Sequence, residues 1–212
     1  MVQPQKLGEE KRQQLIVQNK EASKPVLDDL SQAGLDVDWI EDLYNKRLDY
    51  KKAIPILLRW LTRVENPAVK EAIVRALSVP WARRTEAPVL LVEEFRRSKS
   101  DFGLSWAIGN ALSVVADDIV LNDIVSLIRD KTYGKAREML VVALGNMKSP
   151  DVKHTLIELL DDEDLAGYAI MALGKLKCKE ARSDIERFRT HPKRWVRKEA
   201  KKALVRIDKT IA

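Results

Sequence analysis

The stretch that decides the fold is DDEDLAGYAIMALGKLK, residues 161–177. An acidic turn leads into an apolar run that closes on the pair Ala172-Leu173. Counted from Ala172, apolar residues stand seven and three positions before it and one and four positions after it. These offsets fall on one side of a helix with 3.6 residues per turn. The stretch therefore predicts a short helix with one buried stripe, which needs a neighbouring element to cover it.

The same Ala-Leu pair closes five apolar runs: EAIVRALSV, WAIGNALSVV, MLVVALGNM, YAIMALGKL and EAKKALVRI. The alanines are Ala76, Ala111, Ala143, Ala172 and Ala203, which are spaced 35, 32, 29 and 31 residues apart. Each run repeats the same stripe, and four residues after each alanine come Pro80, Val115, Met147, Leu176 and Ile207. A recurring period of about 30 residues indicates a repeat protein.

A second set of helices is predicted between these runs, at 53–63, 87–97, 121–130, 152–161 and 181–190. Candidate caps and turns separate the helices at Asn66-Pro67, Asp101, Ser149-Pro150-Asp151 and His191-Pro192. Each unit is then a pair of short antiparallel helices that cannot bury its stripe alone. Stacking the pairs solves this problem. The predicted fold is an all-α, right-handed α-solenoid of helical hairpins with no strands.

Four segments carry a resemblance to a known repeat: DYKKAIPILLRWL (49–61), VKEAIVRALS (69–78), DDEDLAGYAIMALGKLK (161–177) and WVRKEAKKALVRI (195–207). They resemble the short HEAT-like repeats of the phycobilisome-lyase type, and the resemblance covers about residues 49–209. It implies that the first helix of each hairpin lines a concave surface. It also implies that Arg137 and Arg197 are structural arginines, which tie to an acidic residue in a neighbouring turn.

The predicted organisation has four parts. Residues 1–22 are a polar arm, either a frayed helix or disordered, and residues 23–48 are a helical cap. In this cap Ser23 starts a helix that ends near Gly34, and Asp36 or Asp38 starts the next one. Residues 49–190 hold the HEAT-like repeats, and residues 191–212 form a basic capping helix.

Composition narrows the class of protein. Hydrophobic residues make up 45% and charged residues 33% of the chain, which is typical of a globular protein rich in amphipathic helix. The start lacks a basic end followed by an apolar stretch, so we expect no secretory signal. No apolar run is long enough to cross a membrane. The single Cys178 excludes an internal disulfide. We therefore expect a cytoplasmic monomer.

Catalytic patterns are scarce. The two histidines, His154 and His191, fall in different repeats and neither is followed by Glu. There is no phosphate-binding glycine-rich loop and no nucleophile elbow. The acidic run at 161–164 precedes a helix, where Asp serves as an N-cap. We expect no enzyme activity, no metal and no cofactor.

One enzyme alternative stays open, a HEAT-like DNA glycosylase with a tryptophan-lined face and an essential carboxylate. The chain has five tryptophans, and Asp117 and Asp118 follow the helix of Trp106. Trp39 and Trp60 lie among apolar neighbours, so we expect them in the core. Because a fold alone does not give a function, this alternative ranks low.

The predicted binding face is the side of the first helices that is turned away from the buried stripe. Its residues are Arg75, Trp106, Asn110, Asn146, Tyr168, Met171, Lys175 and Trp195. Trp, Tyr, Met, Arg and Asn on a face that the core does not need are typical of a protein interface. The sequence therefore favours a non-catalytic scaffold with a protein partner of unknown identity. The opposite interpretation, that these side chains pack between repeats, stays open.

Nucleic-acid binding by the basic end is the runner-up. Residues 191–212 hold eight Lys or Arg against Glu199 and Asp208, which accounts for the whole net charge of +6. The candidate phosphate contacts are Lys193, Arg194, Lys198, Lys201 and Lys202. The plainer interpretation is a solvated cap that keeps the end of the stack soluble.

Overall fold

The computed structural model describes residues 4–209, and within this range the ordered elements are all helical, with no strand. The all-α prediction is therefore confirmed, while the handedness of the stack stays a prediction. The chain divides into two compact units, residues 1–77 and 78–212. Each unit is described by itself below.

Unit 1 contains a long helix, a single turn of helix and one hairpin. The elements are α1 (Pro4–Gln32), α2 (Asp42–Asn45), a 3-10 turn at Lys51–Ala53, α3 (Ile54–Leu61) and α4 (Pro67–Leu77). Helix α1 packs against both helices of the hairpin, α3 and α4. Tyr50 is buried and its hydroxyl donates to the carbonyl of Ala76, 2.9 Å away. Burial raises the pKa of Tyr50 to about 12, so the phenol stays a neutral donor.

The predicted helix start at Ser23 is wrong, because α1 runs through it without a break. The Ser23 hydroxyl donates back to the carbonyl of Lys20 at 2.9 Å, a bond that a serine inside a helix can make. Pro25 therefore lies inside the helix and not in its first turn. The predicted end near Gly34 is confirmed: α1 stops at Gln32, and Gly34 has a φ of 71°, which favours glycine.

The second cap helix also differs from the prediction. Asp36 and Asp38 do not start it; α2 begins at Asp42, whose carboxylate accepts from the backbone N–H of Asp38 at 3.1 Å. Trp39 is not a core residue, since 36% of it is exposed and the Lys20 ammonium lies 5.8 Å from its ring centroid. Trp60 is half-buried, and its indole N–H donates to Asp29 at 2.7 Å. An indole N–H needs a partner, and Asp29 supplies it near the surface.

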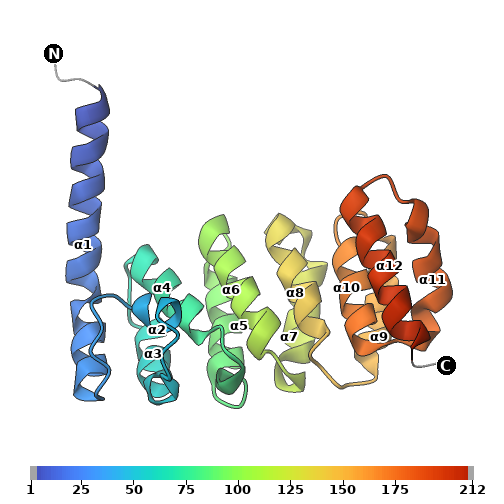
Figure 1. The fold of residues 1–212 in the computed structure, drawn as a ribbon, viewed down its shortest axis with the longest axis horizontal. Helices are drawn as coiled ribbons and strands as arrows, with labels where there is room; N and C mark the ends of the chain where they lie inside the picture. Colours follow the sequence, from blue (N-terminus) through green and yellow to red (C-terminus); the bar gives the residue numbers. More distant parts are fainter. Residues whose placement is uncertain (1–3, 210–212) are drawn as a thin grey trace. The chain divides into compact units, whose positions relative to one another are not determined.

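Unit 2 contains four pairs of helices, in which the even-numbered helices are the predicted first helices of the repeats. Its α-helices are α5 (Ala87–Arg97), α6 (Phe102–Val115), α7 (Leu121–Arg129), α8 (Arg137–Leu144), α9 (Asp151–Glu158), α10 (Ala166–Leu176), α11 (Arg182–Glu186) and α12 (Arg194–Asp208), joined by short 3-10 turns. Each odd-numbered helix packs on the even-numbered helix that follows it. The even-numbered helices then pack in chain order, α6 on α8, α8 on α10 and α10 on α12 (Figure 1).

The buried stripe is confirmed at its centre. All five alanines of the repeat are buried, and so are the leucines that follow them and the residues three positions before them. Departures occur at the edges: Pro80 is exposed, and Leu104 and Leu176 are half-buried. Pro80 lies beyond the end of α4, so the helical periodicity no longer applies there.

Glycines after the Ala-Leu pair explain how neighbouring repeats approach. A methyl group at Gly174 would lie 2.7 Å from the Cα of Ala203, and one at Gly145 would lie 3.2 Å from the Cα of Ala172. Each glycine thus faces the central alanine of the next repeat. The two helices come close because neither residue carries a larger side chain.

Side chains cap two helices where the sequence predicts it. The side chain of Asn66 accepts from the N–H of Val69 at 3.1 Å, and that of Asp101 from Leu104 at 3.0 Å. In the acidic run, Asp162 accepts from the N–H of Asp164 at 3.0 Å and of Leu165 at 3.3 Å. These bonds close the turn before α10, whose N-cap is Leu165 without a side-chain cap bond, so the run has a structural role in the turn but does not supply the predicted N-cap.

The two arginines with an expected structural role differ in their partners. Arg137 is buried, donates to the carbonyl of Ile128 at 2.9 Å and lies 3.7 Å from the Asp162 carboxylate, as the resemblance implies. Arg197 instead donates to the carbonyls of His191 and Pro192, at 2.6 and 2.8 Å. Arg197 therefore closes the turn before its own helix.

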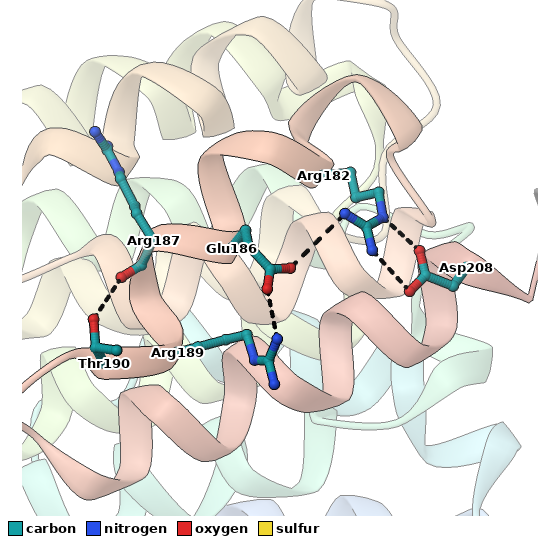
Figure 2. Close-up of polar contacts among 6 residues, drawn as sticks. All are labelled: Arg182, Glu186, Arg187, Arg189, Thr190 and Asp208. Carbon is teal, nitrogen blue, oxygen red and sulfur yellow. Dashed lines mark hydrogen bonds and ion pairs between the residues drawn. The ribbon is translucent and has the colours of Figure 1, made fainter.

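Ion pairs tie the last helix to the one before it (Figure 2). Arg182 of α11 donates to Asp208 at the end of α12, with an N–O distance of 2.7 Å. Glu186 contacts both Arg182 and Arg189, at 3.8 and 2.6 Å. The hydrogen bond from Arg182 lowers the pKa of Asp208 below its ordinary range. The C-terminal end of α12 is thus anchored by charge, whereas its N-terminal end meets the site described next.

Candidate binding surface

The even-numbered helices of unit 2 present one continuous face, here called the first-helix face (α6, α8, α10 and α12). A pocket of about 450 Å³ lies on this face, and eight residues line it. Four are aromatic: Phe102, Trp106, Tyr168 and Trp195. Four are charged: Lys135, Glu138, Asp164 and Lys193. We call this site the aromatic pocket; all eight residues lie at or near the N-terminal ends of their helices.

The aromatic rings form two pairs. Phe102 and Trp106, one turn apart on α6, have ring centroids 6.0 Å apart. Tyr168 of α10 and Trp195 of α12 have centroids 5.2 Å apart. Phe102 is 57% exposed and Trp195 is 39% exposed, while Trp106 and Tyr168 are half-buried. A considerable part of this aromatic surface therefore faces solvent.

Trp195 both packs between repeats and lines the pocket. Its ring lies directly over Gly167 of α10, where an added methyl group would come within 2.0 Å of the indole. Only glycine leaves room for the ring in this position. Because the ring is also 39% exposed, one side of it contacts α10 and the rest stays accessible. Trp195 thus packs between repeats, and its exposed part lines the pocket.

A short hydrogen bond orients the acidic side of the pocket. The Tyr168 hydroxyl donates to the Glu138 carboxylate at 2.6 Å. Burial, and then this bond, raise the pKa of Tyr168 above its ordinary value of 10.0, so the phenol remains a donor at neutral pH. Glu138 stands in the first turn of α8, where the helix dipole stabilises a negative charge. Its position therefore has a structural explanation.

The helix dipole, which explains the position of Glu138, does not explain the positions of the two lysines in the pocket. Lys135 precedes α8, and Lys193 is the N-cap of α12. A cation is unfavourable at the positive end of a helix. Across residues 4–209, neither ammonium group takes part in an ion pair or a side-chain hydrogen bond, and both residues are exposed. Folding alone does not account for these two charges.

The comparison with known families bears on the hairpin in the middle of this face. Residues 136–162 match the PBS lyase HEAT-like repeat. The match spans α8 and α9 and contains Arg137, Gly145 and Asp162, whose contacts between elements are described above. No curated protein and no solved structure matches the chain. The resemblance expected from the sequence is thus confirmed for this HEAT-like repeat.

The other end of the first-helix face is built from hydrogen-bonded polar groups; we call Asn110, Asn146 and Lys175 the amide end. Asn146 lies just after α8, the first helix of the matched HEAT-like repeat. Its side chain donates to the carbonyl of Ser113 at 2.6 Å and accepts from Lys175. Asn110 donates to the carbonyl of Trp106 at 3.0 Å. Burial, and then the charge of Arg83, lower the pKa of Lys175. Asn146 and Lys175 thus link successive repeats, whereas the bond of Asn110 stays within α6.

Two predicted binding residues, Arg75 and Met171, belong neither to the aromatic pocket nor to the amide end. Arg75 belongs to unit 1, where its guanidinium donates to Glu71 on the same helix at 2.6 Å. Met171 is half-buried on α10 and is not among the residues that line the pocket. Trp106, Tyr168 and Trp195 are the predicted residues that the structure brings together.

Four residues of the pocket are not among the predicted binding residues: Phe102, Lys135, Glu138 and Asp164. Lys135, Glu138 and Asp164 occupy repeat positions eight or five residues before the central alanine, as Trp195 and Trp106 do. That register was the available signal for them. Phe102 lies nine residues before Ala111, one position outside the register, and is the first residue of α6, one turn before Trp106.

The basic end adjoins the pocket. Lys193, proposed as a phosphate contact, lines the same pocket as Trp195. Arg194, Lys198, Lys201 and Lys202 are exposed, and Lys202 pairs with Glu199 at 2.7 Å. At 100° per residue, Lys198 lies about 60° around α12 from Trp195, whereas Lys201 lies about 120° away. The two surfaces that sequence reasoning treated as alternatives therefore meet at the start of α12.

The carboxylates of the glycosylase alternative serve turns. Asp117 accepts from the N–H of Ile119 at 3.1 Å, and Asp118 accepts from Lys148 and Ser149 of the next HEAT-like repeat, at 2.8 and 3.1 Å. Neither lines the aromatic pocket. No group of three or more His, Cys, Asp or Glu within residues 4–209 is placed to hold a metal ion. Over the same residues, no helix combines the length and apolar character needed to span a membrane.

A second cavity in unit 2, of about 510 Å³, lies among the turns of the later repeats. Two of its charged residues pair with each other: Lys153 lies 3.1 Å from Glu180, and Glu180 also accepts from the thiol of the neighbouring Cys178 at 3.2 Å. A bond to its own backbone N–H, followed by those from Cys178 and Lys153, lowers the pKa of Glu180 to about 2. With no Phe, Tyr or Trp in its lining and with Lys153 and Glu180 paired, this cavity offers less to a ligand.

Proposed function

We propose that this chain is a non-catalytic scaffold that binds a protein partner through the aromatic pocket of its first-helix face. HEAT-like repeats stack into surfaces that suit recognition of another macromolecule. The observation that carries the proposal is the grouping of Phe102, Trp106, Tyr168 and Trp195 around one open pocket. Large aromatic side chains dominate the energetics of protein interfaces.

The choice of a scaffold over an enzyme rests on the chemistry of the lining residues. None of the eight is a histidine, cysteine or serine. The Glu138 carboxylate is engaged by Tyr168 at 2.6 Å. The rings and the charges around them suit recognition of a side chain better than activation of a nucleophile.

The experiment is capture of the native partner from cell extract on the immobilised chain, followed by mass spectrometry. Trp106→Ala should abolish capture of the partner that the wild-type chain retains. The matched control is Trp81→Ala, because Trp81 is also a tryptophan of unit 2, is 39% exposed and does not line the pocket. Equal loss with both variants, or with neither, would refute the proposal.

Nucleic-acid binding remains the second candidate, because Lys193 and Trp195 join a basic surface to stacking rings. Aromatic stacking plus phosphate contacts is the usual composition of a single-strand site. Its affinity would fall steeply with added salt, because each phosphate contact releases counterions. Capture that persists at high salt and resists nuclease treatment distinguishes a protein partner from this alternative.

A further inference from the structure

The charges around the aromatic pocket identify the kind of partner it fits, an inference that rests on the proposed function. We propose that the partner presents an extended acidic peptide segment, with one large apolar or aromatic side chain seated in the aromatic pocket. The proposal combines three observations: the exposed rings, the unpaired lysines and the placement of the two carboxylates.

The rings provide the anchor site. The pocket volume of about 450 Å³ falls in the usual range for a ligand site, and it exceeds what one side chain needs. Trp106 belongs to α6 and Trp195 to α12, with α8 and α10 packed between them, so the two ring pairs offer separate aromatic surfaces on one pocket, and the anchor side chain needs to contact only one of them. An aromatic or large aliphatic residue gains most from such a surface.

The unpaired cations favour a partner that carries negative charge. Lys135 and Lys193 line the pocket, and Arg194 and Lys198 are exposed beside Trp195. Within residues 4–209 no side-chain partner is formed by any of these four. The first turns of α8 and α12 add the positive ends of two helix dipoles. Carboxylates flanking the anchor residue would find opposite charges here, whereas a basic segment would be repelled.

The two carboxylates favour a peptide over a nucleic acid. Glu138 and Asp164 lie in the same pocket as the lysines. A nucleic acid carries a phosphate at every nucleotide and would bring some of them close to these carboxylates. A peptide can place its acidic side chains near the lysines and offer its backbone N–H groups to Glu138 and Asp164. The mixed lining therefore matches a peptide backbone with acidic side chains.

Four fluorescent probes of matched length test the proposal by anisotropy titration against the full chain. They are the peptides EEDEWEDEE, EEDEAEDEE and KKRKWKRKK, and an oligo(dT). We expect EEDEWEDEE to bind about tenfold more tightly than either other peptide, since both the charge and the ring contribute. We also expect it to bind more tightly than oligo(dT) at every salt concentration.

Charge reversal assigns the effect to the pocket. Lys135→Glu with Lys193→Glu should weaken EEDEWEDEE about tenfold and strengthen KKRKWKRKK. Lys148→Glu with Lys179→Glu is the control: it makes the same change in net charge at two exposed residues that belong neither to the pocket nor to the basic end, and it should leave both affinities nearly unchanged. Circular dichroism of both double variants checks that the helices are retained.

Each other outcome overturns the inference. Preference for the basic peptide, tighter binding of oligo(dT), equal effects of the two double variants, or no binding of any probe would each exclude an acidic segment as the partner. These failures are distinguishable from failure of the proposed function. If Trp106→Ala still abolishes capture of a native protein while EEDEWEDEE does not bind, the scaffold stands and only the class of partner is wrong.

Discussion

The aromatic pocket and the amide end lie on the same first-helix face and come from the same repeat register, yet they differ in what their side chains contact. At the amide end, Asn146 donates to Ser113 of one neighbouring repeat and accepts from Lys175 of the other. At the pocket, Trp195 contacts Tyr168 on one side and keeps 39% of its surface exposed. Residues on the same helical face therefore differ in whether their side chains are accessible to a partner.

The difference has a simple physical cause. Amide groups between helices find backbone carbonyls and charged neighbours, and leaving such groups unpaired is costly. Rings at the helix ends are less constrained, because half of their surface can be covered by a neighbour while the rest faces solvent. The amide end thus contributes to stacking, and the pocket is left for recognition. The predictions below test this division, from the largest expected effect to the smallest.

The largest effect should come from a methyl group placed between two backbones. Gly174→Ala would bring the new carbon within 2.7 Å of the Cα of Ala203, so α10 and α12 would have to separate. We expect a loss of about 3 kcal/mol in the free energy of unfolding, measured by urea titration. Gly167→Ala is the comparison at the pocket end of the same helix, because its new carbon meets only the partly exposed ring of Trp195. It should cost far less; equal losses would show that Trp195 is as fixed as a core residue.

The next effect concerns binding. Trp106→Ala should weaken partner binding by about 2 kcal/mol or more, as loss of an interface anchor does. Its effect on stability should stay well below the roughly 3–5 kcal/mol expected for emptying a core tryptophan site. Isothermal calorimetry with the captured partner and thermal melting measure the two quantities. Unfolding without a specific binding defect would mean that Trp106 serves the stack.

The amide end should give the reverse pattern. Asn146→Ala removes the bond to the Ser113 carbonyl and the acceptor for Lys175. We expect a loss of about 1 kcal/mol in stability and an unchanged affinity for the partner. Urea titration and calorimetry on this variant, beside Trp106→Ala, complete the comparison. A binding defect at Asn146 without loss of stability would extend the site across the whole face.

The smallest effect lies at the far end of α12. Since Arg182 lowers the folded-state pKa of Asp208, the ion pair stabilises the fold above the ordinary aspartate pKa of 3.8 and loses this effect as the pH falls below it. Asp208→Asn should lower the melting temperature slightly at pH 7, because exposed pairs contribute little. The difference from the wild-type chain should shrink as the pH falls. A difference that persists in acid would point to a cause other than this pair.

The amino-acid sequence by itself determined the repeat. The Ala-Leu register, the buried stripe and the caps at Asn66 and Asp101 depend on contacts within a helix or with its first turn. Such contacts follow from helical geometry at 3.6 residues per turn, so spacing alone predicts them. Helix α5 occupies the predicted residues, 87–97, for the same reason.

Tertiary structure decided which parts of the exposed face are free. Trp39 lies at the surface, although Ile40 beside it is buried. Asn146 is occupied because Ser113 and Lys175, some thirty residues away on either side, reach it. The pocket needs Gly167 beneath Trp195 and Phe102 beside Trp106. The contacts of Asn146 and of Trp195 with Gly167 join successive repeats, whereas Phe102 and Trp106 lie one turn apart on α6. The geometry of the contacts between repeats depends on how closely one helix packs on the next, which the spacing within a single helix does not contain.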